Sequence, residues 1–459
     1  KKISLIRVKN FDKENNLYKE VAACIDKINI QSSIISRSLY KIDKIRTWRL
    51  EGPLDSSYSL AILNRYFAQA LDKFVDNLSL KVTEGPGDYT PNLEYLKRYP
   101  GIYRIYKNSN INNDHVEVVS RNMFPPRVTD MDGLFNIFHS YGWEESEFPH
   151  DWADSFNSSL QGITVMSSLV KKILLDNGVN IPIRVTGLGL DHIDQIEADT
   201  SFKINAKKYK LLHVSSCFPR KGIDILIEAY SSIFTKNDDV SLIIKTFSNP
   251  HNNIHEILSS YKKNNEAFPD VIVINDDLTD EALKFLYLQS DVLVAPSRGE
   301  GFGLPIGEAM YLGLPVITTS WGGQMDFCNK SNCWLVDYQF ALSSSHFNSF
   351  NSYWVEPSVD DLAHQILNVY HSSNDDLRKK IENSKSQIKH LTWQNVVKNN
   401  IQFIEEYNQS KIYKKSFKLG CISPFYSRCG IASYSKYLLT NTVEEVVFFT
   451  PYNENNIDE

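Results

Sequence analysis

The chain has 459 residues, of which 42% are hydrophobic and 23% charged, a composition typical of a globular protein with two to three domains. Its formal net charge of -6 argues against a general nucleic-acid binder. We find no apolar run close to the ~20 residues of a membrane-spanning helix, no signal peptide, and no metal or disulfide spacing among the six cysteines, so we expect a cytoplasmic protein.

The first part of the chain is predicted to hold one α/β domain behind a short lead-in. Residues 1–45 read as a strand, a helix and a second short strand, and we interpret them as a lead-in or the remnant of an upstream unit. Over residues 46–205, short apolar runs alternate with helical patterns such as SSLVKKILLDNG, which Gly178 ends. This alternation predicts a parallel sheet covered by helices, that is, a Rossmann-like domain.

A second series of buried strands and helices follows over residues 206–410 and closes with the helical pattern 393–410. We therefore predict two doubly wound α/β domains that face each other across a cleft. Open α/β sheets bind ligands outside the carboxyl ends of their strands. The cleft between the two sheets is accordingly the predicted place of the site.

The end of the chain starts a new pattern. Residues 416–459 read as a strand, a Gly/Pro/Ser loop and a helix, and Ser-Tyr-Ser at 433–435 repeats the Ser-Tyr-Ser at 57–59 in the same context. We interpret this segment as the truncated start of a second domain of the same kind, without partner strands for a sheet.

The stretch APSRGEGFGLPIGEAMYLGLPVITT, residues 295–319, carries the clearest functional pattern. A buried strand ends near Ser297, and a helix is predicted over 304–312 with Pro305 in its first turn. The loop between them lies where backbone N–H groups and the helix dipole favour an anion such as a diphosphate. Gly301 and Gly303 remove side chains that would block close approach.

Two carboxylates, those of Glu300 and Glu308, flank this predicted anion site. Seven residues separate them in the sequence. They would repel the anion, but a carboxylate accepts two hydrogen bonds from a vicinal diol. A nucleotide sugar carries such diols on its ribose and on its hexose, one on each side of the diphosphate. A single glutamate is more often a solvated surface residue, whereas the pair together with the glycine loop is much more specific.

In these residues the chain resembles the retaining GT-B glycosyltransferases of family 4, whose E-x7-E signature matches the pair of glutamates. SSCFPRKGIDILIEAY is similar to the family's second signature, in which basic residues followed by Gly open a helix and hold the donor diphosphate. EGPLDSSYSLAILNR and HSYGWEESEFPHDW resemble the acceptor-side domain of bacterial members that build surface polysaccharides. The resemblance covers about residues 46–410, and it implies the GT-B fold with a donor domain over 206–410.

The resemblance implies a role for each matching residue. Lys221 would pair with the donor phosphates, and Arg220 would assist, because Ser216 stands where family members commonly have another Arg. The alternative for both basic residues is a solvated turn. Glu308 would bind the donor ribose.

On the sugar side, Glu300 and the neighbouring backbone would hold the hydroxyls and support charge at the reacting carbon. That backbone belongs to Gly301, Phe302, Gly303 and Leu304. His139 stands where the family often has a histidine that faces the sugar, although a lone His after an apolar strand is as often structural.

The same resemblance implies a hexosyltransferase that needs no cofactor and no metal and uses a GDP- or UDP-sugar as its substrate. GDP-mannose is the leading candidate, and the acceptor would be a glycan or lipid-linked glycan of O-antigen or a similar polysaccharide, reached by peripheral contact with the inner membrane. Residues 275–277, Asn-Asp-Asp, imitate a metal motif but fit the nucleotide base better. Trp143, Glu144, Glu145 and the segment 121–127 would shape an acceptor pocket or serve in packing.

Two other readings of the sequence stay open. A GT-B-type nucleotide-sugar epimerase or a phosphorylase would share the fold, but epimerases lack the paired-glutamate loop and the pyridoxal-lysine context of phosphorylases is not visible. A non-catalytic module that binds glycans or nucleotides would share it too, although such a module would be expected to lose Lys221, Glu300 or Glu308.

Overall fold

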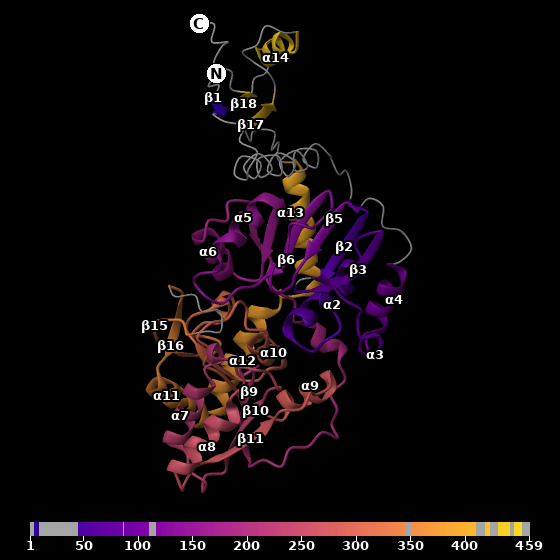
Figure 1. The fold of residues 1–459 in the computed structure, drawn as a ribbon. Coiled ribbons are helices and arrows are strands. Elements are labelled where there is room, and N and C mark those ends of the chain that lie inside the picture. The colour runs from indigo at the N-terminus through magenta and orange to yellow at the C-terminus, as the bar shows by residue number, and fades with distance from the viewer. Residues whose placement is uncertain are drawn as a thin grey trace. The chain divides into compact units, whose positions relative to one another are not determined.

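The computed structural model describes residues 4–8, 45–85, 87–109, 116–344, 351–409, 418–422, 430–440 and 445–451. These residues form two units, one from residues 44–403 and the other from residues 1–43 and 404–459. The larger unit contains two mainly parallel sheets with helices around them (Figure 1), which confirms the predicted α/β class. Within the described residues, no helix has both the length and the apolar character needed to cross a membrane.

The first domain is built on a seven-stranded sheet in the order β4-β3-β2-β5-β6-β7-β8. Neighbouring strands in this sheet run parallel, except that β4 is antiparallel to β3. The strands are β2 (Thr47–Gly52), β3 (Asn77–Glu84), β4 (Gly87–Asp88), β5 (Val118–Arg121), β6 (Phe135–Tyr141), β7 (Gly162–Val165) and β8 (Ile183–Val185). The helices are α2 (Ser59–Leu71), α3 (Leu93–Leu96), α4 (Pro100–Asn108), α5 (His150–Ser159), α6 (Ser168–Asp176) and the 3-10 turn η1 (Asp191–Gln195).

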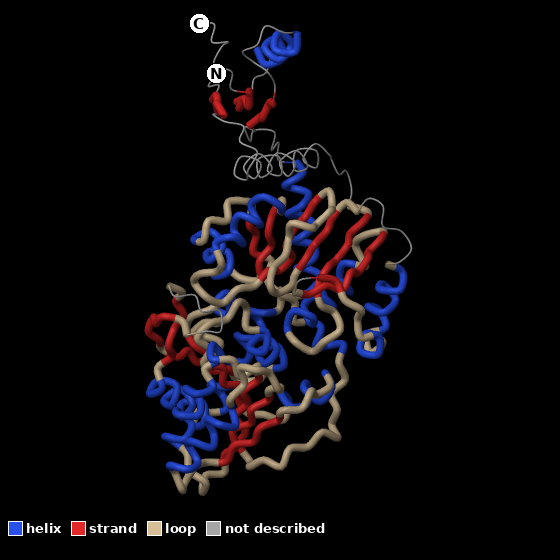
Figure 2. Tube along the Cα trace, viewed as in Figure 1, coloured by secondary structure: helices blue, strands red, loops and turns tan. Residues whose placement is uncertain are grey.

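The second domain has a six-stranded parallel sheet, whose strands are drawn red in Figure 2. Its strand order is β11-β10-β9-β12-β13-β14. Its strands are β9 (Tyr209–Val214), β10 (Val240–Lys245), β11 (Asp270–Ile274), β12 (Val292–Ala295), β13 (Val316–Thr319) and β14 (Trp334–Val336). Its helices are α7 (Ile223–Ile233), α8 (Ile254–Asn264), α9 (Asp280–Leu288), α10 (Leu304–Leu312), α11 (Val359–Tyr370), α12 (Asn374–Ile388) and α13 (Trp393–Gln409), with the 3-10 turns η2 (Pro219–Lys221) and η3 (Gly323–Asp326). Directly after β14 the chain leaves this sheet, because β15 (Tyr338–Leu342) pairs antiparallel with β16 (Tyr353–Pro357).

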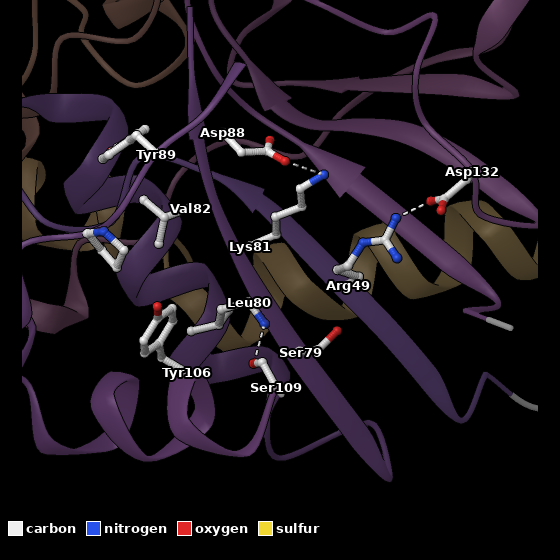
Figure 3. A pocket seen from close by; sticks show the side chains of 11 residues that line it. Arg49, Ser79, Leu80, Lys81, Val82, Asp88, Tyr89, Tyr106, Ser109 and Asp132 are labelled. Atoms are coloured by element: carbon white, nitrogen blue, oxygen red, sulfur yellow. Dashed lines mark hydrogen bonds and ion pairs between the residues drawn. The ribbon is translucent and has the colours of Figure 1, made fainter. Parts of the chain in front are cut away.

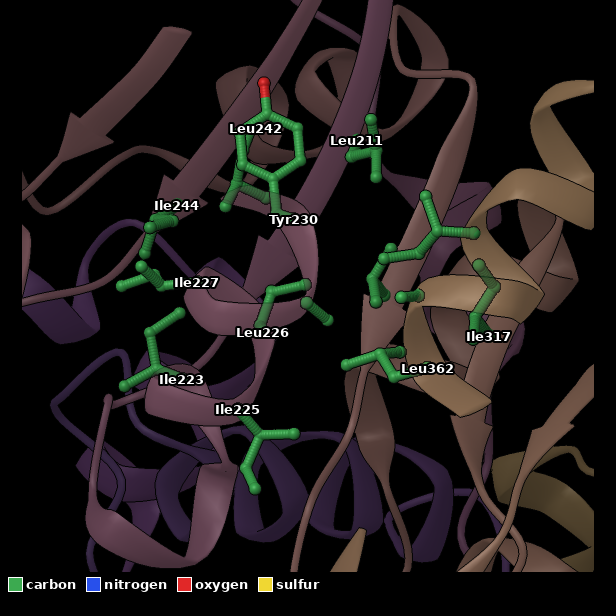
Figure 4. Close-up of a cluster of buried hydrophobic side chains, with 14 of the residues drawn as sticks. Leu211, Ile223, Ile225, Leu226, Ile227, Tyr230, Leu242, Ile244, Ile317 and Leu362 are labelled. Carbon is green, nitrogen blue, oxygen red and sulfur yellow. The ribbon is translucent and has the colours of Figure 1, made fainter. Parts of the chain in front are cut away.

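The core of the second domain explains why its strands read as continuous apolar runs. β10 is buried along its whole length, as expected for a central parallel strand covered on both faces. Helix α7 packs Leu226 and Tyr230 against this sheet, where Leu211 and Leu242 meet them (Figure 4). Full burial of one such side chain contributes about 1.5–3 kcal/mol.

Helix α13 ties the second domain back to the first. The Thr164 hydroxyl on β7 donates to Asn400 Oδ1 on α13 at 2.7 Å. Gly162 leaves room for the Phe403 ring, which would lie 2.5 Å from any Cβ at that position. The predicted closing helix is therefore confirmed, whereas the domain boundaries at residues 205 and 410 stay predictions.

One face of the first sheet carries charges where β2, β3 and β5 lie together. Glu51 and Arg121 are fully buried, and Glu51 accepts from Arg49 Nε at 2.7 Å and from Arg121 Nε at 2.8 Å. Arg49 also pairs with Asp132, and both border a pocket of about 380 Å³ that Lys81 helps to line (Figure 3). The Glu51 carboxylate thus bridges two guanidinium groups inside the domain.

The smaller unit differs from its prediction. β1 (Ser4–Val8), β18 (Glu445–Pro451) and β17 (Lys418–Ile422) form a parallel sheet in the order β1-β18-β17, and helix α14 (Gly430–Thr440) connects β17 to β18. The prediction that 416–459 lacks partner strands is wrong, because the edge of β18 pairs with a strand from the opposite end of the chain. The helix and second strand predicted within 1–45 lie outside the described residues, and the interpretation as a truncated second domain stays a prediction.

We expect Glu51→Gln to lower the free energy of unfolding by about 3 kcal/mol, because it removes the buried carboxylate that Arg49 and Arg121 share. Urea denaturation of the purified protein measures this loss. Asp132→Asn is the matched control, since its side chain is 68% exposed, and it should cost less than about 1 kcal/mol. Equal losses of unfolding free energy in the two variants would show that burial does not determine how much Glu51 contributes to stability.

Candidate functional site

The glycine loop has the predicted geometry of a strand-to-helix turn. β12 ends at Ala295 and α10 begins at Leu304, with Pro305 in its first turn and Gly303 at its N-cap with a φ of +85°. A Cβ at Gly301 would lie 3.1 Å from the Met166 sulfur of the first domain. A side chain at Gly301 would press on the Met166 sulfur, and Gly303 has a left-handed backbone, so both positions favour glycine at the start of the helix.

Glu300 projects from this loop into a basic environment. Its side chain is buried, and its Oε1 accepts from Lys221 Nζ at 2.5 Å and from the Ser297 hydroxyl at 2.8 Å. Burial alone would raise the pKa of Glu300, but the charges of Lys221 and Arg220 hold it below its usual value. The carboxylate is therefore ionised at neutral pH and paired with a lysine.

Lys221 and Arg220 come from the turn that precedes α7. Gly222 caps that helix with a φ of +65°, and a Cβ there would lie 2.0 Å from the Pro296 carbonyl oxygen. Arg220 donates to the Gly299 carbonyl at 3.2 Å, and burial together with this neighbouring cation lowers the pKa of Lys221. The structure thus brings Lys221, Arg220 and Glu300 together at the ends of β9 and β12.

Arg298 is the residue of this site that sequence reasoning missed. Its guanidinium forms a bidentate pair with Asp224 at 2.8 and 2.7 Å, donates to the Pro219 carbonyl at 2.6 Å, and reaches Glu356 Oε2 at 2.8 Å. Its backbone N–H also donates to the Arg220 carbonyl at 2.7 Å. The signal in the sequence was an arginine at the start of a loop in which every second residue is a glycine.

Glu308 lies one turn into α10 and has its own partners. Tyr287 donates to its Oε2 at 3.0 Å, and His192 Nε2 lies 3.3 Å from its Oε1. Trp393 Nε1 donates to His192 Nδ1 at 3.2 Å, so the proton of the neutral imidazole is on Nε2 and points toward Glu308. Glu308 is thus fixed by neutral donors, whereas Glu300 is paired with cations.

The first domain supplies Glu144 to the same place. Its Oε1 lies 3.1 Å from Arg220 Nη2, and its carbonyl oxygen would lie 2.6 Å from a Cβ at Gly299. Glu145 is buried instead and accepts from the Ser343 hydroxyl at 2.9 Å. Arg121, which opens the predicted acceptor segment, is held by Glu51 inside the first sheet.

His139 occupies a packing environment. The side chain is fully buried, its Nε2 lies 2.9 Å from Asn64 Oδ1, and its ring stacks on Phe67 at 4.5 Å. Burial lowers its pKa to about 3. Both of these contacts come from α2 rather than from the loop that carries Glu300, so its predicted role beside the sugar has no support from geometry and stays a prediction.

Residues 194–388, which contain Lys221, Glu300 and Glu308, match the family model described as "Glycosyl transferases group 1". The chain is 30% identical to the capsular polysaccharide biosynthesis glycosyltransferase CapM of Staphylococcus aureus over 36% of this chain and 44% of that protein. It is 23% identical to the O-antigen biosynthesis glycosyltransferase WclY of Escherichia coli over 50% of this chain and 63% of that protein. The chain therefore spans about half the length of the curated relatives that it matches.

Two solved structures show the fold. Sucrose-phosphate synthase of Thermosynechococcus elongatus has a TM-score of 0.58 at 16% identity and covers 80% of this chain and 100% of its own. HepE of Anabaena, solved in complex with UDP-glucose, has a TM-score of 0.56 at 12% identity over 79% of this chain and 100% of its own. With the two sheets above, this likeness confirms the GT-B fold of two Rossmann-like domains.

We expect stability to fall on acidification because His139 is buried without charge. Its pKa is lowered from 6.5 to about 3, so the stabilisation is complete above pH 6.5 and is lost as the pH falls toward 3, at about 1.4 kcal/mol per pH unit. Urea denaturation at a series of pH values should show a shallower decline in His139→Leu than in the wild type. An unchanged slope, or turnover at pH 7.5 abolished in a variant that stays folded, would contradict a packing role.

Proposed function

We propose that this protein is a retaining family 4 glycosyltransferase that transfers a hexose, with mannose the leading candidate, from a nucleotide sugar to a glycan in surface-polysaccharide assembly. The observation that carries this proposal is the ion pair of Lys221 and Glu300 at a glycine-rich strand-to-helix loop. The match to group 1 glycosyl transferases over 194–388 supports it. The partial sequence similarity to CapM and to WclY, which are both named as polysaccharide or O-antigen glycosyltransferases, also supports it.

The donor diphosphate would take the place of Glu300 as the partner of Lys221. Arg220 lies beside that lysine, and the first backbone N–H groups of α10 face the same loop. A diphosphate carries more charge than a carboxylate and accepts from all of these donors at once. Its charge grows as it leaves the sugar, so these fixed donors stabilise the transition state more than the ground state.

Once Lys221 turns to the phosphates, Glu300 is free to accept from a sugar hydroxyl. Its negative charge then lies near the anomeric carbon, where positive charge develops as the bond to the diphosphate oxygen breaks. The acceptor hydroxyl attacks that carbon on the face that the diphosphate leaves, and its proton passes to the departing phosphate. The new bond therefore keeps the configuration of the old one.

Glu308 would bind the donor ribose. Each of its oxygens accepts one hydrogen bond from Tyr287 or His192, and a carboxylate oxygen can accept two. The diol of a ribose can therefore bind without displacing either donor. On the other side of the loop, Glu144 lies where an acceptor would approach from the first domain, and a lipid-linked acceptor would bring the cytoplasmic protein to the inner membrane as a peripheral partner.

A screen of GDP- and UDP-sugars tests the proposal and separates it from its rivals. Titration calorimetry finds the nucleotide that binds, and release of nucleoside diphosphate from the matching sugar, with and without a glycan acceptor, shows transfer. Binding without release would support the non-catalytic module. Conversion of the donor to an epimer without release would support the epimerase, and absence of binding to any member of the panel would overturn the donor site.

We expect the two glutamates to separate in their effects. Glu308→Gln should weaken binding of the nucleoside diphosphate and of the nucleotide sugar alike, by about 1.5–3 kcal/mol, because the ribose is common to both ligands. Glu300→Gln should not weaken the binding of the free nucleoside diphosphate, since it removes the carboxylate that competes with the phosphates for Lys221. The same change should lower turnover. Calorimetry and turnover of the same two preparations provide the measurement.

The pattern of these results decides between assignments. Loss of nucleotide affinity in Glu300→Gln together with normal affinity in Glu308→Gln would reverse the roles. If neither variant changed binding or rate, the donor site would lie elsewhere. Asp326→Asn, on an exposed residue beyond the loop, is the control that should leave both quantities unchanged.

A further inference from the structure

The second domain contains a buried lysine that forms no ion pair with any acidic side chain of the described residues. Lys245 is the last residue of β10 and is only 8% exposed, and its ammonium donates to the carbonyl oxygen of its neighbour Thr246 at 2.8 Å. In the part of the chain that the structure describes, no acidic side chain forms an ion pair with it. Fully buried lysines are rare unless they are paired, because a charge transferred from water to a protein interior loses its hydration.

Nearby carboxylates attract this cation without contacting it. Burial lowers the pKa of Lys245, and the charges of Asp277 and Asp276 offset that effect only in part. Both aspartates are exposed beyond the end of β11. The ammonium is thus held inside the end of the sheet, with acidic groups close by but turned to solvent.

The strand order places Lys245 beside the proposed donor site. The sheet runs β11-β10-β9-β12, and the loops after β12 and β9 carry Glu300 and Lys221. Lys245 pairs with Val214 at the end of β9 and with Ile274 at the end of β11, and neighbouring strands lie about 4.8 Å apart. The next strand end along from the phosphate loop is therefore the one that holds this lysine.

We propose that Lys245 is a further binding residue of the donor site and that its partner is an oxygen atom in the nucleoside monophosphate half of the bound nucleotide. The inference rests on the proposed function. A diphosphate at the β9 loop lies one strand away from Lys245 on β10, so the phosphate of the nucleoside monophosphate half reaches this lysine while Glu308 holds the ribose. There the lysine meets an anionic acceptor at hydrogen-bond distance, which no acidic side chain among the described residues provides.

The test compares binding with stability, because a structural lysine and a ligand-binding lysine differ in both. We expect Lys245→Met to lower the affinity for the nucleoside diphosphate that the wild type binds, UDP or GDP, by about ten- to a hundredfold. The same variant should unfold at an equal or higher urea concentration, since it removes an unpaired buried cation. Titration calorimetry and urea denaturation on one preparation supply both values.

Lys207→Met is the matched control, because the Lys207 ammonium also donates to a backbone carbonyl, that of Lys236 at 2.6 Å, but precedes β9 at the opposite end of the sheet. It should keep wild-type affinity. Wild-type affinity in Lys245→Met, or a loss of affinity accompanied by a loss of stability, would overturn the proposal.

Lys221→Ala separates the two possible failures. If nucleotide binding is lost in Lys221→Ala but unchanged in Lys245→Met, the proposed function stands and the role of Lys245 is wrong. If the wild type binds neither UDP nor GDP, the donor site and the role of Lys245 fail together.

Discussion

The guanidinium of Arg298 fixes the position of the two loops on which the site depends. It is buried within the glycine loop and pairs with Asp224 at the start of α7 and with Glu356 on β16. Burial opposes its charge, but the two carboxylates raise its pKa above the ordinary value of an arginine. Because its planar fork is shared between both acids, the turn that carries Lys221 cannot move away from the glycine loop without breaking the bidentate pair of Arg298 and Asp224.

That constraint gives the free protein a self-neutralised site. Lys221 and Glu300 face each other across the two loops, and Arg220 connects them to Glu144 of the first domain. The cations are therefore held in position before any ligand arrives, and their hydration has already been lost. A ligand that exchanges for Glu300 meets preorganised donors and requires little rearrangement of the protein.

The sequence predicts the local structure of the site, but few of the contacts between residues that are far apart in the chain. The helix over 304–312 and its preceding loop follow from Pro305, Gly303 and an apolar strand, all within one short stretch. The partners of Arg298 are 74 and 58 residues away, so no local pattern shows them. The Asn64 partner of His139 is 75 residues away on α2, so it too is absent from any local pattern. The pairing of β1 with β18 joins opposite ends of the chain and was equally invisible.

The chain passes between the two domains of the larger unit twice, and both crossings run side by side. Leu190 N–H donates to the Leu391 carbonyl at 2.8 Å, and Trp393 N–H donates to Asp191 Oδ1 at 2.8 Å. Gly189 has no space for a side chain because Trp393 lies against it. These two adjacent crossings of the chain act together as one hinge, so the domains open by rotating about the line of the two crossings. Each opening must break the contact between Arg220 and Glu144 together with the hydrogen bond from Ser343 to Glu145, so opening the cleft costs the energy of these contacts.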